Sequence, residues 1–265
     1  MSGATITRPA GPGGAASHAW PPIPFARLTA VELRKQLDTR AGVWLMVVIV
    51  LVNAALIALT LVASAPEDLT WQELTGAASI GQLLLLPLVG VLAATGEWSQ
   101  RTALTTFVLE PRRMRVTLAK LASSVALGLV VMAGALAVAA ALNVLGMTLR
   151  DGDGSWSMDA GVVGGNTLAL VILVVQGVAF GLALLSTPMA IVAYLALPTA
   201  WSVLGLLVTG LRAPAEWLDV NATLMPLMAG EMAGDDWARL GVSVAAWVGV
   251  PLAIGLWRTG RREVS

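Results

Sequence analysis

Six long apolar segments constrain this chain more than any other feature of its 265-residue sequence. Each is 18 to 24 residues long and contains no Asp, Glu, Lys, Arg or His. A helix needs about 20 apolar residues to cross a hydrocarbon core of roughly 30 Å, so each segment is able to span a bilayer. The segments are residues 42–63, 77–95, 121–142, 162–185, 189–211 and 240–257.

The composition is also typical of a membrane protein. Hydrophobic residues make up 57% of the chain and charged residues 12%, and the mean hydropathy is +0.80, far from the composition of soluble domains. Lipid cannot satisfy backbone N–H and C=O groups, so only helices and closed barrels span it. The period-two alternation of barrel strands is absent. We therefore predict an all-α polytopic membrane protein with six transmembrane helices.

The basic residues lie mostly on one side of this topology. If both termini are cytosolic, thirteen of the sixteen Lys and Arg residues fall inside, and only Arg150, Arg212 and Arg239 fall outside. Cytosolic loops of membrane proteins carry such an excess of positive charge. Six spans also return the chain to the side on which it began. The sequence thus predicts a multi-pass protein with both termini in the cytosol.

The segments outside the spans differ in character. Residues 1–24 are rich in Gly, Ala and Pro, and we expect them to form a disordered cytosolic tail. Residues 263–265 form a second, short cytosolic tail, which leaves 25–262 as one transmembrane domain. The outer loop 211–236 contains apolar stretches, so we expect it to fold back as one or two short helices.

Residues 25–40 are predicted to form an amphipathic interfacial helix before the first span. Two roles stay open for it, and they are compatible. It anchors the chain at the lipid headgroups, or it helps to dock a partner. The apolar face of this helix is predicted to contain Ala26, Ala30, Leu33 and Leu37.

Several kinds of chemistry are not expected of this chain. It has no Cys, and its single His, His18, lies in the tail, so no thiolate metal site exists. It lacks the Gly-rich loop with a following Lys that holds nucleotide phosphates. Its spans lack the ionisable groups of intramembrane proteases and proton relays, although sodium coupling through carbonyl and hydroxyl ligands stays open. We expect no catalytic residue, cofactor or metal in this chain, and no enzyme activity of its own.

Five amide side chains lie within the spans or at their edges. Such groups form interhelical hydrogen bonds, worth about 0.6 kcal/mol each, or they line a translocation path. The candidates for such a path are Asn53, Gln82, Asn143, Asn166 and Gln176.

The segment between the second and third spans, residues 96–120, holds five of the sixteen basic residues. Residues 99–110 are predicted to form a short helix with Phe107 on its apolar face, which Pro111 ends. One interpretation is a solvated loop that only fixes the topology. The other is a short amphipathic helix that enters a groove on a soluble partner.

This segment contains a spaced set of charged, hydroxyl and proline residues. They are Glu97, Arg101, Thr102, Thr105, Thr106, Leu109, Pro111, Arg112, Arg113, Arg115, Ala119 and Lys120. Their spacing resembles the E-x-x-x-R/G-T…T…L-x-P-x-R…K pattern of the permease subunits of type-2, exporter-like ABC transporters. Members of that family also have an N-terminal interfacial helix, six spans and cytosolic termini, so the resemblance covers about residues 25–262. Arg101 is a departure, because many members carry Gly before the Thr.

The resemblance implies a set of partners and a location. The location is a bacterial-type cell (plasma) membrane. The partners are a separate ABC ATPase subunit, which binds ATP and Mg, a second permease copy or a paralogue, and the lipid bilayer, with no nucleic acid. Glu97 is also able to pair with a nearby arginine. The residues expected to contact the ATPase are Glu97, Arg101, Phe107, Arg112, Arg113 and Arg115.

The implied function is that of a permease subunit which exports a hydrophobic or amphipathic substrate. Two alternatives stay open. The chain is a membrane anchor or regulatory subunit for a soluble partner, without transport, or it is a secondary carrier that works alone.

Overall fold

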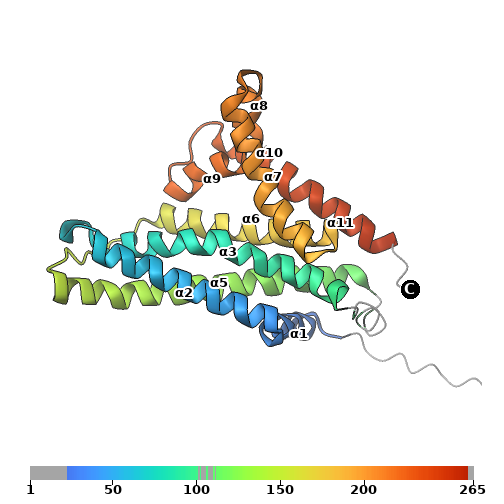
Figure 1. The fold of residues 1–265 in the computed structure, drawn as a ribbon, viewed down its shortest axis with the longest axis horizontal. Helices are drawn as coiled ribbons and strands as arrows, with labels where there is room; N and C mark the ends of the chain where they lie inside the picture. The colour runs from blue at the N-terminus through green and yellow to red at the C-terminus, as the bar shows by residue number, and fades with distance from the viewer. Residues whose placement is uncertain (1–22, 101, 103–105, 107–109, 111, 262–265) are drawn as a thin grey trace, which may run out of the picture.

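A computed structural model describes residues 23–261, except 101, 103–105, 107–109 and 111 (Figure 1). In this part of the chain, six helical stretches are long and apolar enough to cross a membrane, which confirms the predicted all-α, six-span fold. Most of the N-terminal tail and all of the C-terminal tail lie outside the described residues. The six stretches are α2 (Arg40–Ala63), α3 (Trp71–Ser99), α5 (Arg113–Arg150), α6 (Ala160–Leu184), α7 (Thr187–Leu207) and Asp236–Gly260.

Helices α3 and α6 form the centre of the bundle. Half or more of the residues in their most apolar windows are buried, 50% in α3 and 61% in α6, against 17 to 22% in the other four spans. Glycine permits their close approach, because a Cβ on Gly177 of α6 would lie 2.0 Å from the carbonyl oxygen of Pro87 in α3. Small residues at such crossings let transmembrane backbones touch. The less buried α2 and α5 lie on one side of this pair, below α3 in Figure 1.

Helix α5 is longer than its predicted span. It runs for 38 residues from Arg113 to Arg150, whereas the apolar segment covers only 121–142. At 1.5 Å per residue its length is about 57 Å, well beyond a hydrocarbon core of roughly 30 Å. No proline interrupts the stretch. Basic residues such as Arg115 and Lys120 therefore lie on the first two turns of this helix, outside the apolar segment.

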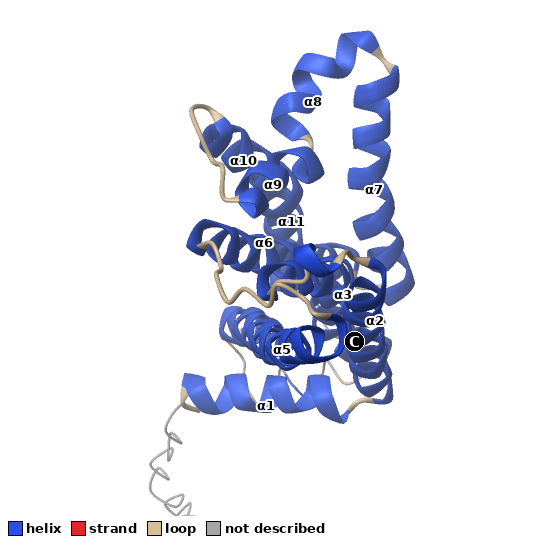
Figure 2. Ribbon diagram, turned by 90° about the vertical axis from the view of Figure 1, so that its left-hand side faces the viewer, coloured by secondary structure: helices blue, strands red, loops and turns tan. Residues whose placement is uncertain are grey.

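Helix α1 (Phe25–Asp38) runs across the start of α5 (Figure 2). We call the end of the bundle that contains α1, Ser99 and Arg113 the inner end. The side of α1 that packs against protein differs from the predicted apolar face, because Leu28, Glu32 and Gln36 are the buried residues. The predicted apolar residues Ala26, Ala30 and Leu37 are exposed, and Leu33 is half-buried.

The outer loop contains two short helices, as predicted. These are α8 (Arg212–Leu218) and α9 (Val220–Ala229). Asp219 caps α9 by accepting hydrogen bonds from two backbone N–H groups of its first turn. Leu224 of α9 packs in one cluster with Ala169 of α6, which holds the loop against the bundle.

The sixth span contains a π-helical turn. This turn, Ala245–Gly249, lies between α10 (Asp236–Val244) and α11 (Val250–Arg261). The following Pro251 has no N–H for the helical ladder, and π turns accommodate such local adjustments. Trp247 within the turn donates its indole N–H to the carbonyl oxygen of Leu218 at 2.6 Å. The turn thereby ties the sixth span to the outer loop.

Candidate functional site

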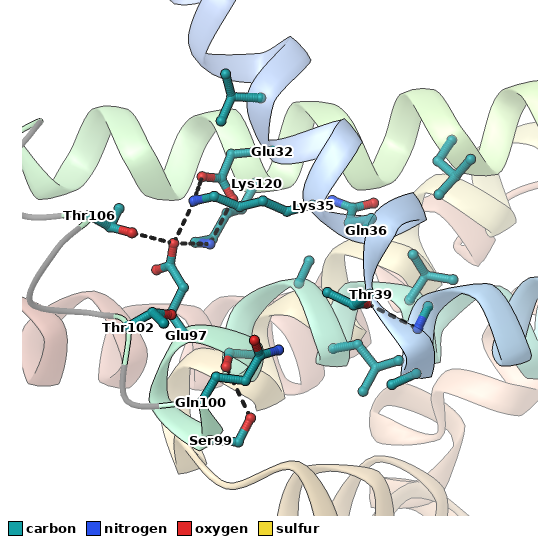
Figure 3. Close-up of a pocket in the computed structure, with 18 of the residues that line it drawn as sticks. Glu32, Lys35, Gln36, Thr39, Glu97, Ser99, Gln100, Thr102, Thr106 and Lys120 are labelled. Atoms are coloured by element: carbon teal, nitrogen blue, oxygen red, sulfur yellow. Dashed lines mark hydrogen bonds and ion pairs between the residues drawn. The ribbon is translucent and has the colours of Figure 1, made fainter.

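Four charged side chains from three helices meet at the inner end (Figure 3). The Glu32 carboxylate accepts hydrogen bonds from the ammonium groups of Lys35 and Lys120, both at 2.7 Å. Oε1 of Glu97 accepts a hydrogen bond from Lys35 at 2.8 Å and lies 3.3 Å from Nζ of Lys120. The two carboxylates and two ammonium groups form a closed ring, which we call the inner charge cluster.

Each helix contributes to this cluster from its inner end. Glu32 and Lys35 are one turn apart on α1, Glu97 lies in the last turn of α3, and Lys120 lies in the second turn of α5. Glu32, Lys120 and Glu97 are only 2%, 4% and 7% exposed, whereas Lys35 is half-buried. Buried charges are tolerated in a protein only when they are paired and hydrogen-bonded, as these are.

The charge of Lys35 is favoured by its two partners. Burial works against the ammonium form, but hydrogen bonds and charges from Glu32 and Glu97 outweigh it and raise the pKa of Lys35 above its ordinary value of 10.5. Lys35 therefore stays positively charged at physiological pH. It keeps its ion pair with Glu32 within α1 and its ion pair with Glu97 of α3.

The cluster also holds the segment 96–120. The hydroxyl of Thr106 donates to Oε1 of Glu97 at 2.8 Å, and the N–H of Thr102 donates to the Glu97 carbonyl oxygen at 2.9 Å. Thr106 and Glu110 each donate a backbone N–H to the residue four positions earlier, which is the helical spacing. Most of the helix predicted over 99–110 lies outside the described residues.

Two of the predicted ATPase-contact residues hold other parts of the inner end together. Arg113 donates to the carbonyl oxygen of Thr259 in α11. Arg115 donates to Glu110 at 2.8 Å and to the carbonyl oxygen of Ile23. Ile23, the first described residue, and Thr259, near the end of α11, are therefore held at this end.

The other predicted contact residues have different settings. Arg112 is exposed at the N-cap of α5. Glu97 is buried, and its charged partners in the described chain are Lys35 and Lys120. Lysine reaches it because α1 and α5 both converge on the end of α3. Arg101 and Phe107 lie outside the described residues.

A cavity of about 770 Å³ adjoins the inner charge cluster. It lies between α1, α2, α3 and the first turns of α5, with Leu45, Met46 and Leu92 on its apolar wall and Lys35 and Glu97 at its charged end. Its volume falls within the range of about 300 to 1,000 Å³ that is usual for ligand sites. The inner end thus combines a charged ring with an adjoining apolar space.

Two of the five amide candidates bind outer loops. Asn143 of α5 donates to the carbonyl oxygen of Gly154 at 3.1 Å. Asn166 of α6 donates to the carbonyl oxygen of Met228 at 3.1 Å, and so ties α6 to the end of α9. These are the structural hydrogen bonds that the sequence left open as one of two interpretations.

The other three amides, Asn53, Gln82 and Gln176, are buried in contacts between helices. Within the described part of the chain, neither amide atom of Gln176 has a hydrogen-bond partner. Gly81 packs on Asn53, since a Cβ there would lie 2.5 Å from Oδ1. None of the five candidates is among the described residues that line the large cavity.

Sequence reasoning did not assign Glu32, Lys35 or Lys120 to a site. The available signal was weak. Glu32 and Lys35 have the i, i+3 spacing of an intrahelical ion pair, and Lys120 directly precedes an apolar segment. The convergence of α1 and α5 on Glu97 depends on tertiary packing, which local spacing does not contain.

The fold defines the chain as an all-α, multi-pass membrane protein. No protein-family model matches it, and neither does any curated protein or solved structure. Among the described residues, no group of three or more His, Asp or Glu side chains is arranged to hold a metal ion.

Proposed function

We propose that this chain is the membrane-spanning permease subunit of an ATP-driven ABC transporter that exports a hydrophobic or amphipathic substrate. A separate ATPase subunit binds and hydrolyses ATP with Mg, and a second copy of this chain or a paralogue completes the membrane part. The six apolar spans and the motif in residues 96–120 support this proposal. The observation that carries it is the bonding of that segment to the inner charge cluster.

A motor outside the membrane moves transmembrane helices only if its docking point is joined to them. In this chain Thr106, within the proposed docking segment, bonds to Glu97 of α3. Glu97 is in turn paired with Lys35 of α1 and Lys120 of α5. A force on the segment therefore reaches three helices. ATP drives the change through its different affinity for the closed and open states of the ATPase pair.

Arg112 is the best-placed contact for the ATPase, because it is exposed within the segment. Arg113 and Arg115 are engaged with Thr259 and Glu110, so they shape the docking surface as well. In this proposal the inner end faces the cytosol, both termini are cytosolic, and the membrane is a bacterial-type cell membrane.

Co-purification with a co-expressed ABC ATPase subunit tests the docking step. Arg112→Glu reverses the exposed charge, and we expect it to abolish recovery of the ATPase while membrane insertion stays normal. Arg34→Glu is the matched control, since Arg34 is an exposed arginine of α1 at the same end but outside the segment. An unchanged yield of complex with Arg112→Glu would sink the assignment.

Vesicle transport separates the proposal from its alternatives. Vesicles with the chain and the ATPase should move an amphipathic dye only when ATP is supplied. A membrane anchor without transport function predicts no flux in either case. A secondary carrier predicts ATP-independent flux from the chain alone.

A further inference from the structure

The large inner cavity has two chemically different parts. Leu45 and Met46 of α2 and Leu92 of α3 form an apolar wall. The other end is formed by one side of α1 and by Glu97 (Figure 3). A space with this division suits an amphiphile, whose chains lie on apolar side chains while its headgroup meets the polar end.

The polar end of the cavity contains hydrogen-bond acceptors that receive no hydrogen bond from another described residue. All contacts of the Glu97 carboxylate with other described residues go to Oε1, which leaves Oε2 without a partner among them. Gln36 is 7% exposed and donates its amide N–H to Ser123 at 2.8 Å, but its Oε1 has no partner in the described chain. A buried acceptor without a donor is costly, which applies to Oε1 of Gln36. Both residues line the cavity, and Oε2 of Glu97 is an acceptor that a ligand with N–H donors can use.

The cavity also has a positively charged side chain at its edge. Arg27 is exposed and lines the edge of the cavity from the first turn of α1, and its guanidinium forms no hydrogen bond or ion pair with another described residue. Arg27 thus offers a positive group, and Glu97 a carboxylate oxygen without a donor, to one ligand. A guanidinium binds phosphate oxygens by paired hydrogen bonds. The ligand that complements both groups carries a phosphate next to an ammonium.

We propose that this cavity binds one phospholipid of the phosphatidylethanolamine class. Its primary ammonium donates hydrogen bonds to Oε2 of Glu97, its phosphate binds Arg27, and its acyl chains lie against Leu45, Met46 and Leu92. A lipid is the source that fits the place, because α1 is amphipathic and its apolar residues outside the protein contacts are exposed. The site belongs to the chain itself and stands whether or not an ATPase docks beside it.

This site distinguishes lipids by their headgroups. A choline headgroup has the positive charge but no N–H to donate, and a glycerol headgroup lacks the positive charge. A hydrogen bond to a charged group contributes about 1.5 to 3 kcal/mol. Phosphatidylethanolamine should therefore be retained on the order of tenfold more than phosphatidylcholine or phosphatidylglycerol.

The test uses the full chain alone, purified from mixed micelles containing equal amounts of these three lipids, with bound lipid counted by native mass spectrometry. We expect one phosphatidylethanolamine per chain in preference to the other two. Glu97→Gln should reduce its retention to the level of phosphatidylcholine. Arg27→Gln should reduce retention of all three lipids, since all carry a phosphate. Equal retention of the three lipids by the unaltered chain would overturn the proposal.

Two further measurements test the proposal even if Glu97→Gln fails to fold. Ala93→Phe fills the cavity from α3 and should abolish the bound lipid, whereas Ala55→Phe places the same bulk on the exposed side of α2 and should not. Retention of lipid by Ala93→Phe would place it elsewhere on the surface. Excess soluble glycerophosphoethanolamine should not displace the lipid; complete displacement would show that the site takes the free headgroup compound and would contradict the proposal.

Discussion

Lys120 is the residue on which the inner charge cluster depends most. Its ammonium is buried and lies against both carboxylates. Lys120→Met leaves Glu32 and Glu97 with only Lys35, and removal of one partner from a buried pair costs about 3 to 5 kcal/mol. We expect a clear drop in the unfolding midpoint in detergent, followed by the fluorescence of the chain's 10 tryptophans.

A double substitution is the control for that change. Lys120→Met combined with Glu32→Gln removes one positive and one negative charge together, so part of the stability should return. Lys35→Met alone should cost less than Lys120→Met, because the Lys35 side chain is 40% exposed and water screens its pairs. Equal losses from the two lysines would contradict this ranking.

The raised pKa of Lys35 makes a prediction for alkaline pH. A folded-state pKa above 10.5 means that Lys35 contributes stability that is fully present below pH 10.5 and is lost as the pH rises through the higher folded value. The difference in unfolding midpoint between the unaltered chain and Lys35→Met should thus be constant through neutral and mildly alkaline pH and then shrink. A difference that already shrinks near neutrality would contradict the raised pKa.

Single residues also show where sequence reasoning stops. Glu97 was found from its motif, but the motif does not identify its partners, which in the described chain are two lysines. The lysine partners come from α1 and α5, 62 and 23 positions away. No periodicity connects residues at such distances, so only the packed structure brings Glu97 to Lys35 and Lys120.

Among the elements, α3 and α6 pack so closely that their contact is sensitive to side-chain size. Gly177→Ala places a methyl group against the Pro87 carbonyl oxygen, and forcing the helices apart should cost about 1 to 3 kcal/mol. Gly164→Ala is the matched control on the same helix, because its Cβ would meet no atom within 4 Å. A lower unfolding midpoint for the first variant alone supports this packing; equal midpoints for both variants would contradict it.

Helix α9 depends on its cap. Asp219 accepts backbone hydrogen bonds from Asn221 and Ala222 and a hydroxyl hydrogen bond from Ser202 of α7. Asp219→Ala should cost about 1 kcal/mol and expose the outer loop to protease added to sealed vesicles that present this side. Glu216→Ala removes only a long, exposed ion pair with Arg239 and should leave cleavage unchanged. Equal protection of the loop in both variants would argue against the cap.

The elements that the sequence predicted well are those with a strong local signal. Six apolar runs of sufficient length give six spans, because lipid demands continuous helices. The full length of α5 was missed, since its first turns carry Arg113, Arg115 and Lys120 and so do not count as apolar. The buried side of α1 was missed because Glu32 and Gln36 find partners on other helices, whereas its apolar residues are left exposed.

At the scale of the whole molecule, the fold does not determine which end of the bundle faces the cytosol, so this orientation is to be measured. The chain has no Cys, so single cysteines report accessibility without background. Ser157→Cys is exposed in the loop after α5, and Arg34→Cys is exposed at the inner end. A membrane-impermeant maleimide should label the first in intact cells and the second only after permeabilisation. The reverse pattern would invert the predicted topology.

Helix α5 is unbroken over its whole length, so a tilt of this helix displaces both of its ends. Arg113 holds its inner end to Thr259, and Arg150 holds its outer end to the carbonyl oxygen of Leu61. Between these two ends, Gly128 lies close to Leu170 and Val174 of α6. This contact is a point about which α5 can tilt. The arm from there to Arg150 spans 22 residues and the arm to Arg113 only 15. A rigid shaft tilting on that point moves its outer tip farther than its inner tip, and in the opposite direction.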